Sequence, residues 1–408
     1  MPLIDYSFLE KILPKAKIKK SYRNAKQSYL NRVRLATSLF FFGMGFCFAT
    51  WASRIPDIKS MLQLSEAGLG TLLFALPVGQ LIGMPFSGRI VAKYGSRNIV
   101  IMALPVYAFC LTLLGLATVK WQLALGLFLF GFFGNFCNIA VNTQGVYTQQ
   151  LFEKPIMGSF HGSWSLAGFF GAVTSLFMLA IELTPYQHFW VAFVFTLLIV
   201  LFNYKFIIKA KVKKKGEQSN YSFIKNPDMT LIWLGVVCFC GMASEGVMFD
   251  WSGVYFKDII KAPGALVVLG YTTFMISMAC GRFLSDILVR KYGARKVLMT
   301  SGIIISCGLY TAVLFPYLIP CTIAFMMVGF GVSNVVPIII SVAGKNEKVP
   351  TSIALTIVSS ISFLGFLMGP PLIGFIAELT SLKYSFAIIG VFGLFITILV
   401  SQLKIFRN

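Results

Sequence analysis

Two carboxylates, Glu245 and Asp250, lie within one long apolar stretch of the chain, residues 230–256. If a helix begins near Thr230, Glu245 lies about 22 Å along its axis, because an α-helix rises 1.5 Å per residue. In a helix that crosses a bilayer, a carboxyl group at that depth is a candidate for taking up and releasing a proton. We therefore expect both acids to couple the protein to protons. The alternatives are a permanent ion pair or an amide-bonded carboxyl for Glu245, and a solvated helix end for Asp250.

Three amide side chains recur within a second apolar stretch, at Asn135, Asn138 and Asn142. At 3.6 residues per turn they share one narrow face of a helix, and Gln149 continues that face. An amide both donates and accepts hydrogen bonds, so the face suits a water-filled cavity whose ligand carries hydroxyl groups. The alternative is hydrogen bonding between neighbouring helices.

A histidine and a tryptophan, His161 and Trp164, lie about one turn apart in the segment GSFHGSWSLAGFFGA. The imidazole can relay a proton or donate a hydrogen bond, and the indole can stack on a sugar ring. A histidine that only anchors helix packing is the alternative. We expect Asn334 to shape the cavity wall opposite the amide face, and His188 to be a loop residue without a special role.

The composition indicates what kind of protein holds these residues. Hydrophobic residues make up 57% of the chain, charged residues 12%, and the mean hydropathy is +0.81. A soluble domain is nearer a quarter charged, so we expect an all-α polytopic membrane protein. Segments of about 20 apolar residues predict twelve transmembrane helices. They cover residues 34–55, 67–90, 98–118, 121–147, 156–181, 187–208, 230–256, 265–289, 297–317, 319–343, 351–377 and 384–403.

Catalysis finds no support in the sequence. Paired carboxylates, a nucleophile–base set, a metal-ligand cluster and a Walker-type phosphate loop are all missing. We therefore expect no enzyme, no metal ion and no cofactor.

Basic residues predict the orientation. Most of the 35 Lys and Arg residues fall on the side of the bilayer that carries both termini, as expected of a cytoplasmic side. The exceptions are Arg54, Lys59, Lys120, Lys257, Lys261 and Lys383 on the opposite side and Arg282 inside a span. The net charge of +21 is thereby explained by topology and by attraction to anionic lipids, without nucleic acid as a partner.

A repeated turn indicates an internal duplication. KYGSRN at residues 93–98 returns as KYGARK at residues 291–296, and each copy centres on one glycine, Gly95 and Gly293. A period of half the chain length predicts two equivalent bundles, with these turns acting as a hinge pair. We expect a basic N-terminal arm (1–33), an N-terminal six-helix bundle (34–208), a linker (209–228) and a C-terminal six-helix bundle (229–405).

These motifs resemble those of a known family. GRIVAKYGSR at residues 88–97 resembles the signature turn of the major facilitator superfamily, and GRFLSDILVRKYGARK at residues 281–296 resembles its second-half version. WASRIPDI, PIMGSFHGSWSLAG and EGVMFDWSGVY resemble the bacterial branch grouped with the fucose permease. The resemblance implies twelve helices in two pseudo-symmetric bundles, alternating access to the two sides of the membrane, and a place in the bacterial inner membrane.

The resemblance also implies a gate. The signature usually carries an aspartate where this chain has Ala92, so a cytoplasmic latch would belong mainly to the second half. Its candidates are Arg282, Asp286 and Arg290, spaced i, i+4, i+8 on one helix face. A local ion-pair ladder that only solvates a helix end is the alternative.

A second gate is expected at the outer end. Arg54 ends the first span, and Asp250 is its counterpart by pseudo-symmetry. We expect the two side chains to pair across the halves when the outer end is closed.

Together these features predict a secondary transporter, acting as a monomer in membrane lipid, for proton-coupled uptake of a small polar solute such as a sugar or sugar derivative. The alternative is a proton-antiport exporter of a hydrophobic compound, suggested by the 40 phenylalanines. A non-transporting membrane receptor on the same scaffold would be marked by loss of the embedded polar groups or by an added soluble domain, and the sequence shows neither.

Overall fold

The computed structural model describes residues 15–64, 66–152, 154–209, 228–263, 266 and 269–406. Within these residues the chain is helical, without strands, and twelve helices are long and apolar enough to cross a membrane. The predicted all-α membrane fold is confirmed. The helices are α1 (Lys15–Met61), α2 (Glu66–Leu73), α3 (Ala75–Tyr94), α4 (Ser96–Gly115), α5 (Lys120–Phe152), α6 (Met157–Ala180), α7 (Pro185–Asn203), α8 (Met229–Val254), α9 (Leu269–Tyr292), α10 (Ala294–Leu314), α11 (Leu318–Ala343), α12 (Thr351–Leu379) and α13 (Leu382–Gln402).

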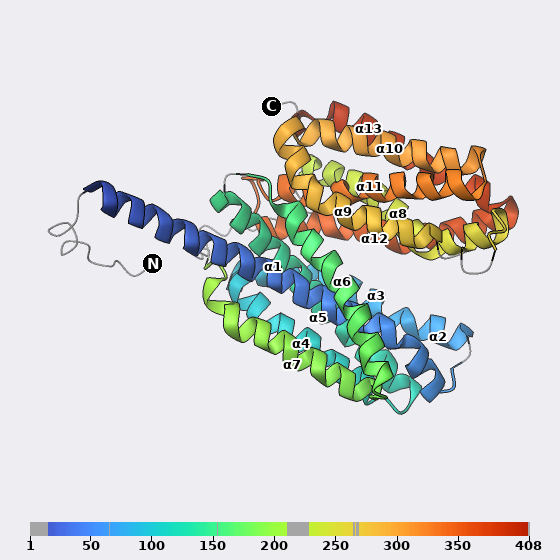
Figure 1. Cartoon of the computed structure of the whole chain (residues 1–408), viewed down its shortest axis with the longest axis horizontal. Coiled ribbons are helices and arrows are strands. Elements are labelled where there is room, and N and C mark those ends of the chain that lie inside the picture. The colour runs from blue at the N-terminus through green and yellow to red at the C-terminus, as the bar shows by residue number, and fades with distance from the viewer. Residues whose placement is uncertain are drawn as a thin grey trace.

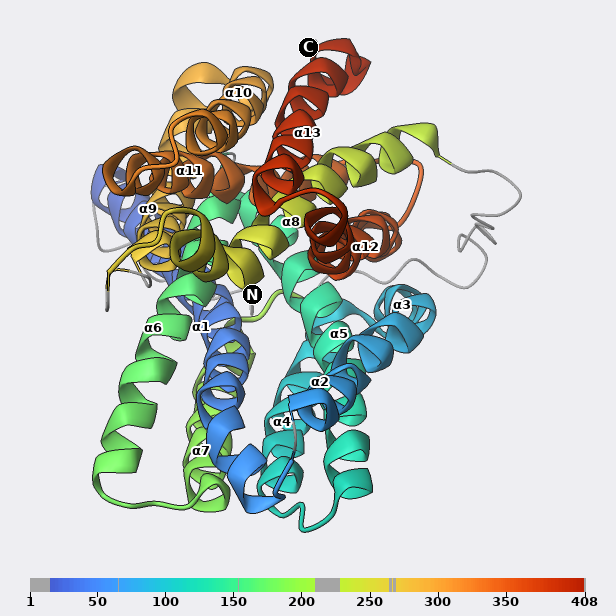
Figure 2. The same cartoon turned by 90° about the vertical axis from the view of Figure 1, so that its right-hand side faces the viewer.

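The helices form two bundles, an N-terminal half of α1–α7 and a C-terminal half of α8–α13 (Figures 1 and 2). In the N-terminal half α3 packs on α5, α1 on α6, and α4 on both α5 and α7. The C-terminal half repeats this pattern, with α9 on α11, α8 on α12, and α10 on both α11 and α13. The two halves are therefore pseudo-symmetric six-span bundles. Most of the expected linker, residues 210–227, lies outside the described residues.

Helix α1 is longer than the predicted first span. Its 47 residues correspond to about 70 Å, whereas the hydrocarbon core of a bilayer is about 30 Å thick. The helix extends through residues 15–33 of the expected basic arm, because that segment is rich in Lys and Arg, which form helices readily, and lacks Pro and Gly. Residues 1–14 of the arm lie outside the described residues.

The second predicted span is divided into two helices. Helix α2 ends at Leu73 and α3 begins at Ala75, with a turn at Phe74. Pro77 has no N–H to donate to the carbonyl of Leu73, so one bond of a continuous helix is missing at this point.

The repeated turns have the same backbone form. Gly95 joins α3 to α4 with φ of 85°, and Gly293 joins α9 to α10 with φ of 81°. Each glycine N–H donates to a valine carbonyl four residues earlier, Val91 or Val289. Positive φ is readily available only to glycine, which explains why both copies of the motif keep it.

The two halves meet at one end of the molecule. Helix α1 begins and α13 ends at this end, which we call the terminal end, and the bundles diverge toward the other end (Figure 1). The main packing between the halves is α6 against α9 and α3 against α12. The four helices of these two seams position the candidate site.

Candidate functional site

A buried ion pair lies where α8 and α9 face the other half. Arg282 Nη2 of α9 is 3.1 Å from Glu245 Oε1 of α8, and the two residues are only 5% and 6% exposed. The same guanidinium reaches across the halves, because Arg282 Nη1 donates to Ser165 Oγ of α6 at 2.6 Å. The centroid of the Trp164 ring lies 5.9 Å from Arg282 Cζ, within the range of a cation–π contact.

Several polar atoms of this cluster have no hydrogen-bond partner among the described residues. They are Glu245 Oε2, Arg282 Nε and His161 Nε2. The centroid of the His161 ring lies 5.4 Å from that of Phe41, with the two rings tilted by 57°, and the imidazole lies within range of the Arg282 charge. Because buried polar groups are almost always paired, these atoms are poised for a ligand, a water molecule or a proton. The structure thus brings His161, Trp164, Glu245 and Arg282 together, and the ion pair is the arrangement weighed above as the alternative for Glu245.

The amide face on α5 bonds mainly within its own helix. Asn142 Nδ2 donates to the backbone oxygen of Asn138 at 2.9 Å, and Oδ1 of Asn138 lies at 3.4 Å. Asn135 and Asn142 are buried, and their side-chain oxygens lack a partner among the described residues. This pattern leaves acceptors free for hydroxyl groups.

Asn334 lies apart from these residues. Its Nδ2 donates to Ser301 Oγ of α10 at 3.2 Å and to the Phe330 carbonyl at 3.0 Å. The amide therefore ties α11 to α10 within the C-terminal half. Its Oδ1, like those of Asn135 and Asn142, has no partner among the described residues, and its place in the cavity wall stays a prediction.

The two outer-gate candidates are not joined in this conformation. Asp250 is exposed on the distal part of α8. Arg54 is 1% exposed and donates three bonds within its own half, to Asp57 Oδ2 at 2.7 Å, His188 Nδ1 at 3.2 Å and the Leu183 carbonyl at 3.0 Å. His188 is therefore a buried partner of Arg54 on α7, and the expectation of a loop residue without a special role is wrong. A buried arginine needs acceptors for its N–H donors, and this need is the signal that could have identified His188 as a partner of Arg54.

Asp286 joins the halves at the terminal end. Its Oδ1 accepts from the Gly158 N–H at 2.8 Å, and its Oδ2 accepts from the Ser159 N–H at 2.8 Å and from the Ser159 hydroxyl. A carboxylate is favoured there, because the first N–H groups of α6 are unpaired and the helix dipole is positive at that end. The ladder of Arg282, Asp286 and Arg290 is not formed, since Arg282 pairs with Glu245 and Arg290 is exposed.

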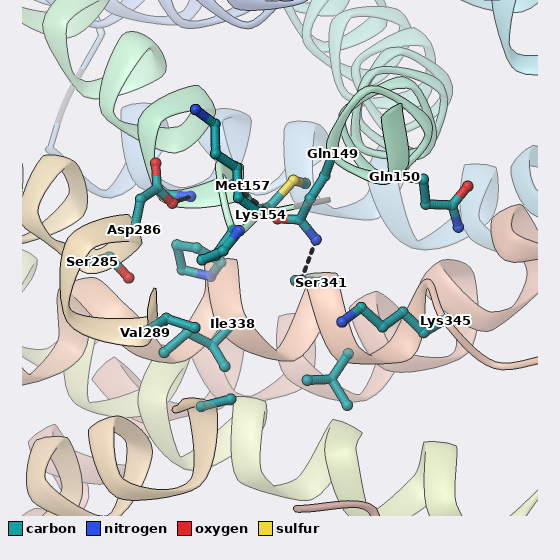
Figure 3. A pocket seen from close by; sticks show the side chains of 15 residues that line it. Gln149, Gln150, Lys154, Met157, Ser285, Asp286, Val289, Ile338, Ser341 and Lys345 are labelled. Atoms are coloured by element: carbon teal, nitrogen blue, oxygen red, sulfur yellow. Dashed lines mark hydrogen bonds between the residues drawn. The ribbon is translucent and has the colours of Figure 1, made fainter. Parts of the chain in front are cut away.

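Gln149 completes this junction. Its Oε1 accepts from the N–H groups of Ile156 at 3.0 Å and Met157 at 3.2 Å, while its Nε2 donates to Ser341 Oγ of α11. The start of α6 is thus capped from within its own half by Gln149 and from the other half by Asp286. Between them lies a cavity of about 270 Å³, with Lys154 and Lys345 among its lining residues (Figure 3).

Among the described residues, the contacts between α3 and α12 in the second seam involve no carboxylate. The Gly88 carbonyl of α3 accepts from Ser352 Oγ of α12 at 3.0 Å. A Cβ at Gly88 would collide with the Thr356 side chain, so the close approach of α3 and α12 depends on this glycine. Ala92, where the resemblance places an acid, lies one turn further along α3.

A bundle of this architecture, with paired polar groups buried between two halves, defines a secondary membrane transporter. The sequence model of the Major Facilitator Superfamily matches residues 35–349 and 263–405. An uncharacterized MFS-type transporter of Yersinia pestis is 31% identical over 357 residues, covering 88% of this chain and 92% of the relative. The chain belongs to the Major Facilitator Superfamily.

Solved structures agree in fold. The transporter FucP in its outward conformation has a TM-score of 0.74 at 18% identity, covering 92% of this chain and 99% of the other. A second structure of FucP, described as the fucose:proton symporter of E. coli, has a TM-score of 0.70 at 17% identity, with 92% and 98% covered.

Proposed function

We propose that this transporter takes up a small polar solute, such as a sugar or sugar derivative, together with protons. The observation that carries the proposal is the buried Arg282–Glu245 pair with its spare polar atoms beside His161 and Trp164. Charged groups buried in a membrane protein are costly, and they commonly mark the path of a substrate or a proton. The fucose:proton symporter among the structural neighbours is consistent with this proposal.

The orientation follows from the charge distribution. The basic residues gather at the terminal end, so that end faces the cytoplasm of a bacterial inner membrane by the positive-inside pattern. The halves join at that end and diverge at the other (Figure 1), and this arrangement supports our assignment of an outward-facing form. Opening the terminal end would require Asp286 to leave the start of α6 and Ser352 to leave Gly88.

Uptake in proteoliposomes tests the proposal. Under an imposed proton gradient, the wild-type protein is expected to accumulate a solute, and Glu245→Gln is expected to abolish accumulation while exchange of solute across the membrane continues. Glu347→Gln, which neutralises an exposed carboxyl outside the ion pair and outside the contacts between the halves, controls for general damage to the transport cycle. If the Glu245→Gln protein still concentrates solute against a gradient, Glu245 is not the coupling site.

A further inference from the structure

We propose that the solute carries a carboxylate group, and that Arg282 binds this group in place of Glu245. The inference rests on the proposed function and adds the chemical class of the substrate: a small hydroxylated organic acid, such as an aldonate or a uronate, in preference to a neutral sugar.

The first argument is the geometry of the guanidinium group. Glu245 Oε1 contacts Arg282 only at Nη2, while Arg282 Nε and Glu245 Oε2 lack partners among the described residues. Nε and Nη2 form one edge of an arginine, and that edge matches the two oxygens of a carboxylate. Glu245 therefore uses half of a site that an incoming carboxylate could fill with two bonds.

The second argument is the charge of the site. The groups that face Arg282 are Glu245 on α8, His161, Trp164 and Ser165 on α6, and Asp286 one turn away on α9. The carboxylate of Asp286 is already occupied by the first N–H groups of α6. Glu245 is thus the single acid that contacts the guanidinium among the described residues, and a proton on Glu245 leaves the arginine buried without a counter-ion. Such a charge is strongly unfavourable, and an anionic solute removes the imbalance whereas a neutral sugar does not.

These two arguments define the exchange. The solute carboxylate takes the Nε and Nη2 positions, Glu245 is released, and the released carboxylate binds one proton from the outer solution. No covalent bond forms or breaks within the solute, and one anion enters with one proton, so the transported charge is zero. By linkage, the proton and the anion each favour the binding of the other by the same factor.

The fixed surroundings suit such a solute. Ser165 holds the third guanidinium nitrogen, Nη1, and Trp164 lies against the group, so Arg282 keeps its orientation while the other edge exchanges partners. Asn135 and Asn142 of α5, in the other half, have side-chain oxygens without a partner among the described residues, and such acceptors suit hydroxyl groups.

Matched ligands test the substrate class. Purified full-length protein is mixed with D-gluconate, D-galactonate or D-glucuronate, and with D-glucose and D-galactose as neutral parents, and its melting temperature is measured at acid and mildly alkaline pH. At least one acid is expected to raise the melting temperature, with an affinity that falls about tenfold per pH unit as protons become scarce. A panel in which only neutral sugars bind, or in which no carboxylate binds, overturns the proposal.

Variants identify the anchor. Glu245→Gln imitates the protonated acid, so it is expected to bind the carboxylate with an affinity that no longer depends on pH. The double variant Glu245→Gln/Arg282→Gln is uncharged at the site, which protects the fold, and it is expected to lose carboxylate binding. Retained carboxylate binding in the double variant removes Arg282 as the anchor.

Charge movement separates this inference from the proposed function. In proteoliposomes, proton-coupled uptake of D-gluconate should respond to a pH gradient but produce no current, whereas uptake of a neutral sugar with a proton would produce one. Carboxylate binding without any response to the pH gradient would contradict proton coupling and leave the anchor standing. Proton-driven uptake of D-glucose or D-galactose that produces a current, without uptake of the acids, would contradict the carboxylate inference and leave the coupling standing.

Discussion

Asp286 of α9 and Gly88 of α3 occupy equivalent positions before the repeated turns, and each contacts the other half. Asp286 accepts bonds from two N–H groups at the start of α6. Gly88 offers only its carbonyl to Ser352 and lets α12 approach because it lacks a side chain. Both seams of this pseudo-symmetric fold pack closely at a glycine, since a Cβ at Gly158 of α6 would also collide with α9, but the first seam adds a charged helix cap.

Removing the cap should loosen the first seam. Asp286→Ala deprives α6 of its partner from the other half, and loss of a helix cap costs about 1–2 kcal/mol. We expect the population with an open terminal end to rise roughly 5- to 30-fold. The measurement is alkylation of a cysteine introduced at Val342, which lines the cavity beside the cap. Ser352→Ala, which removes one neutral hydrogen bond from the other seam, should give a smaller increase, and equal reactivity in all three proteins would contradict this account.

Adding a side chain at Gly88 should loosen the second seam. Gly88→Ala places a methyl group against Thr356, so α3 and α12 must separate or the threonine must move. We expect faster alkylation at the terminal end and a lower melting temperature, with overpacking costing about 1–3 kcal/mol. Gly168→Ala is the matched control, because a Cβ there meets nothing within 4 Å. A Gly88→Ala protein that behaves like this control would show that the seam is not tightly packed.

The buried ion pair should be far more sensitive to single than to double substitution. Arg282→Ala leaves Glu245 buried without a counter-ion, and breaking a buried pair in this way costs about 3–5 kcal/mol. The double variant Arg282→Gln/Glu245→Gln removes both charges and should recover much of this loss. Thermal unfolding of the single and double variants checks the expectation. Additive losses would mean that the two residues do not interact.

Arg54 should stabilise the end opposite the terminal end. Its guanidinium joins α1 to the loop carbonyl of Leu183 and to His188 of α7. Arg54→Gln should therefore lower the melting temperature more than Asp57→Asn, because the Asp57 carboxylate is part-exposed and only one of the three partners. Arg54→Lys keeps the charge but can satisfy fewer acceptors, and we expect an intermediate value. A melting temperature unchanged by Arg54→Gln would argue against this anchor.

Asp228 gives a defined dependence of stability on pH. Burial alone would raise the pKa of this carboxyl, but hydrogen bonds from Asn346 and from the Thr230 N–H, with the charge of Lys348, lower the pKa below its ordinary value of 3.8. When the pKa of a carboxyl is lower in the folded state than in the unfolded state, the ionised group stabilises the protein at every pH above the unfolded-state pKa. This contribution is lost as the pH falls through the folded-state pKa.

The test uses a substitution that keeps the helix cap. Asn is as good an N-cap as Asp, so Asp228→Asn should preserve α8 at acid pH. Melting temperatures of wild type and variant should differ at neutral pH, begin to converge as the pH falls below about 4, and meet once the pH is below the folded-state pKa of Asp228. A constant difference at every pH would exclude a contribution from the ionised carboxylate.

The sequence predicts the spans and the duplication well, because apolar length and the glycine turns are local properties. It predicts the candidate site less well. Asp286 binds backbone N–H groups, and no residue type in the sequence indicates such a partner. Arg282 pairs with Glu245 and not with the acid on its own helix, Asp286, because tertiary packing places Arg282 and Glu245 together. The different contact at Gly88 could have been predicted, because alignment of the two repeated turns places Gly88 where the other half has Asp286.

The long first helix has a consequence for how the motion could be observed. Helix α1 continues well past the thickness of a bilayer as one rod that belongs to the N-terminal half (Figure 1). A rotation of that half by about 10° would carry a point about 35 Å along such a rod through roughly 6 Å. A fluorophore at the exposed Gln27, paired with one on the C-terminal half, would therefore read the rotation as a change in distance, and any protein tethered to the rod would be displaced with every turnover.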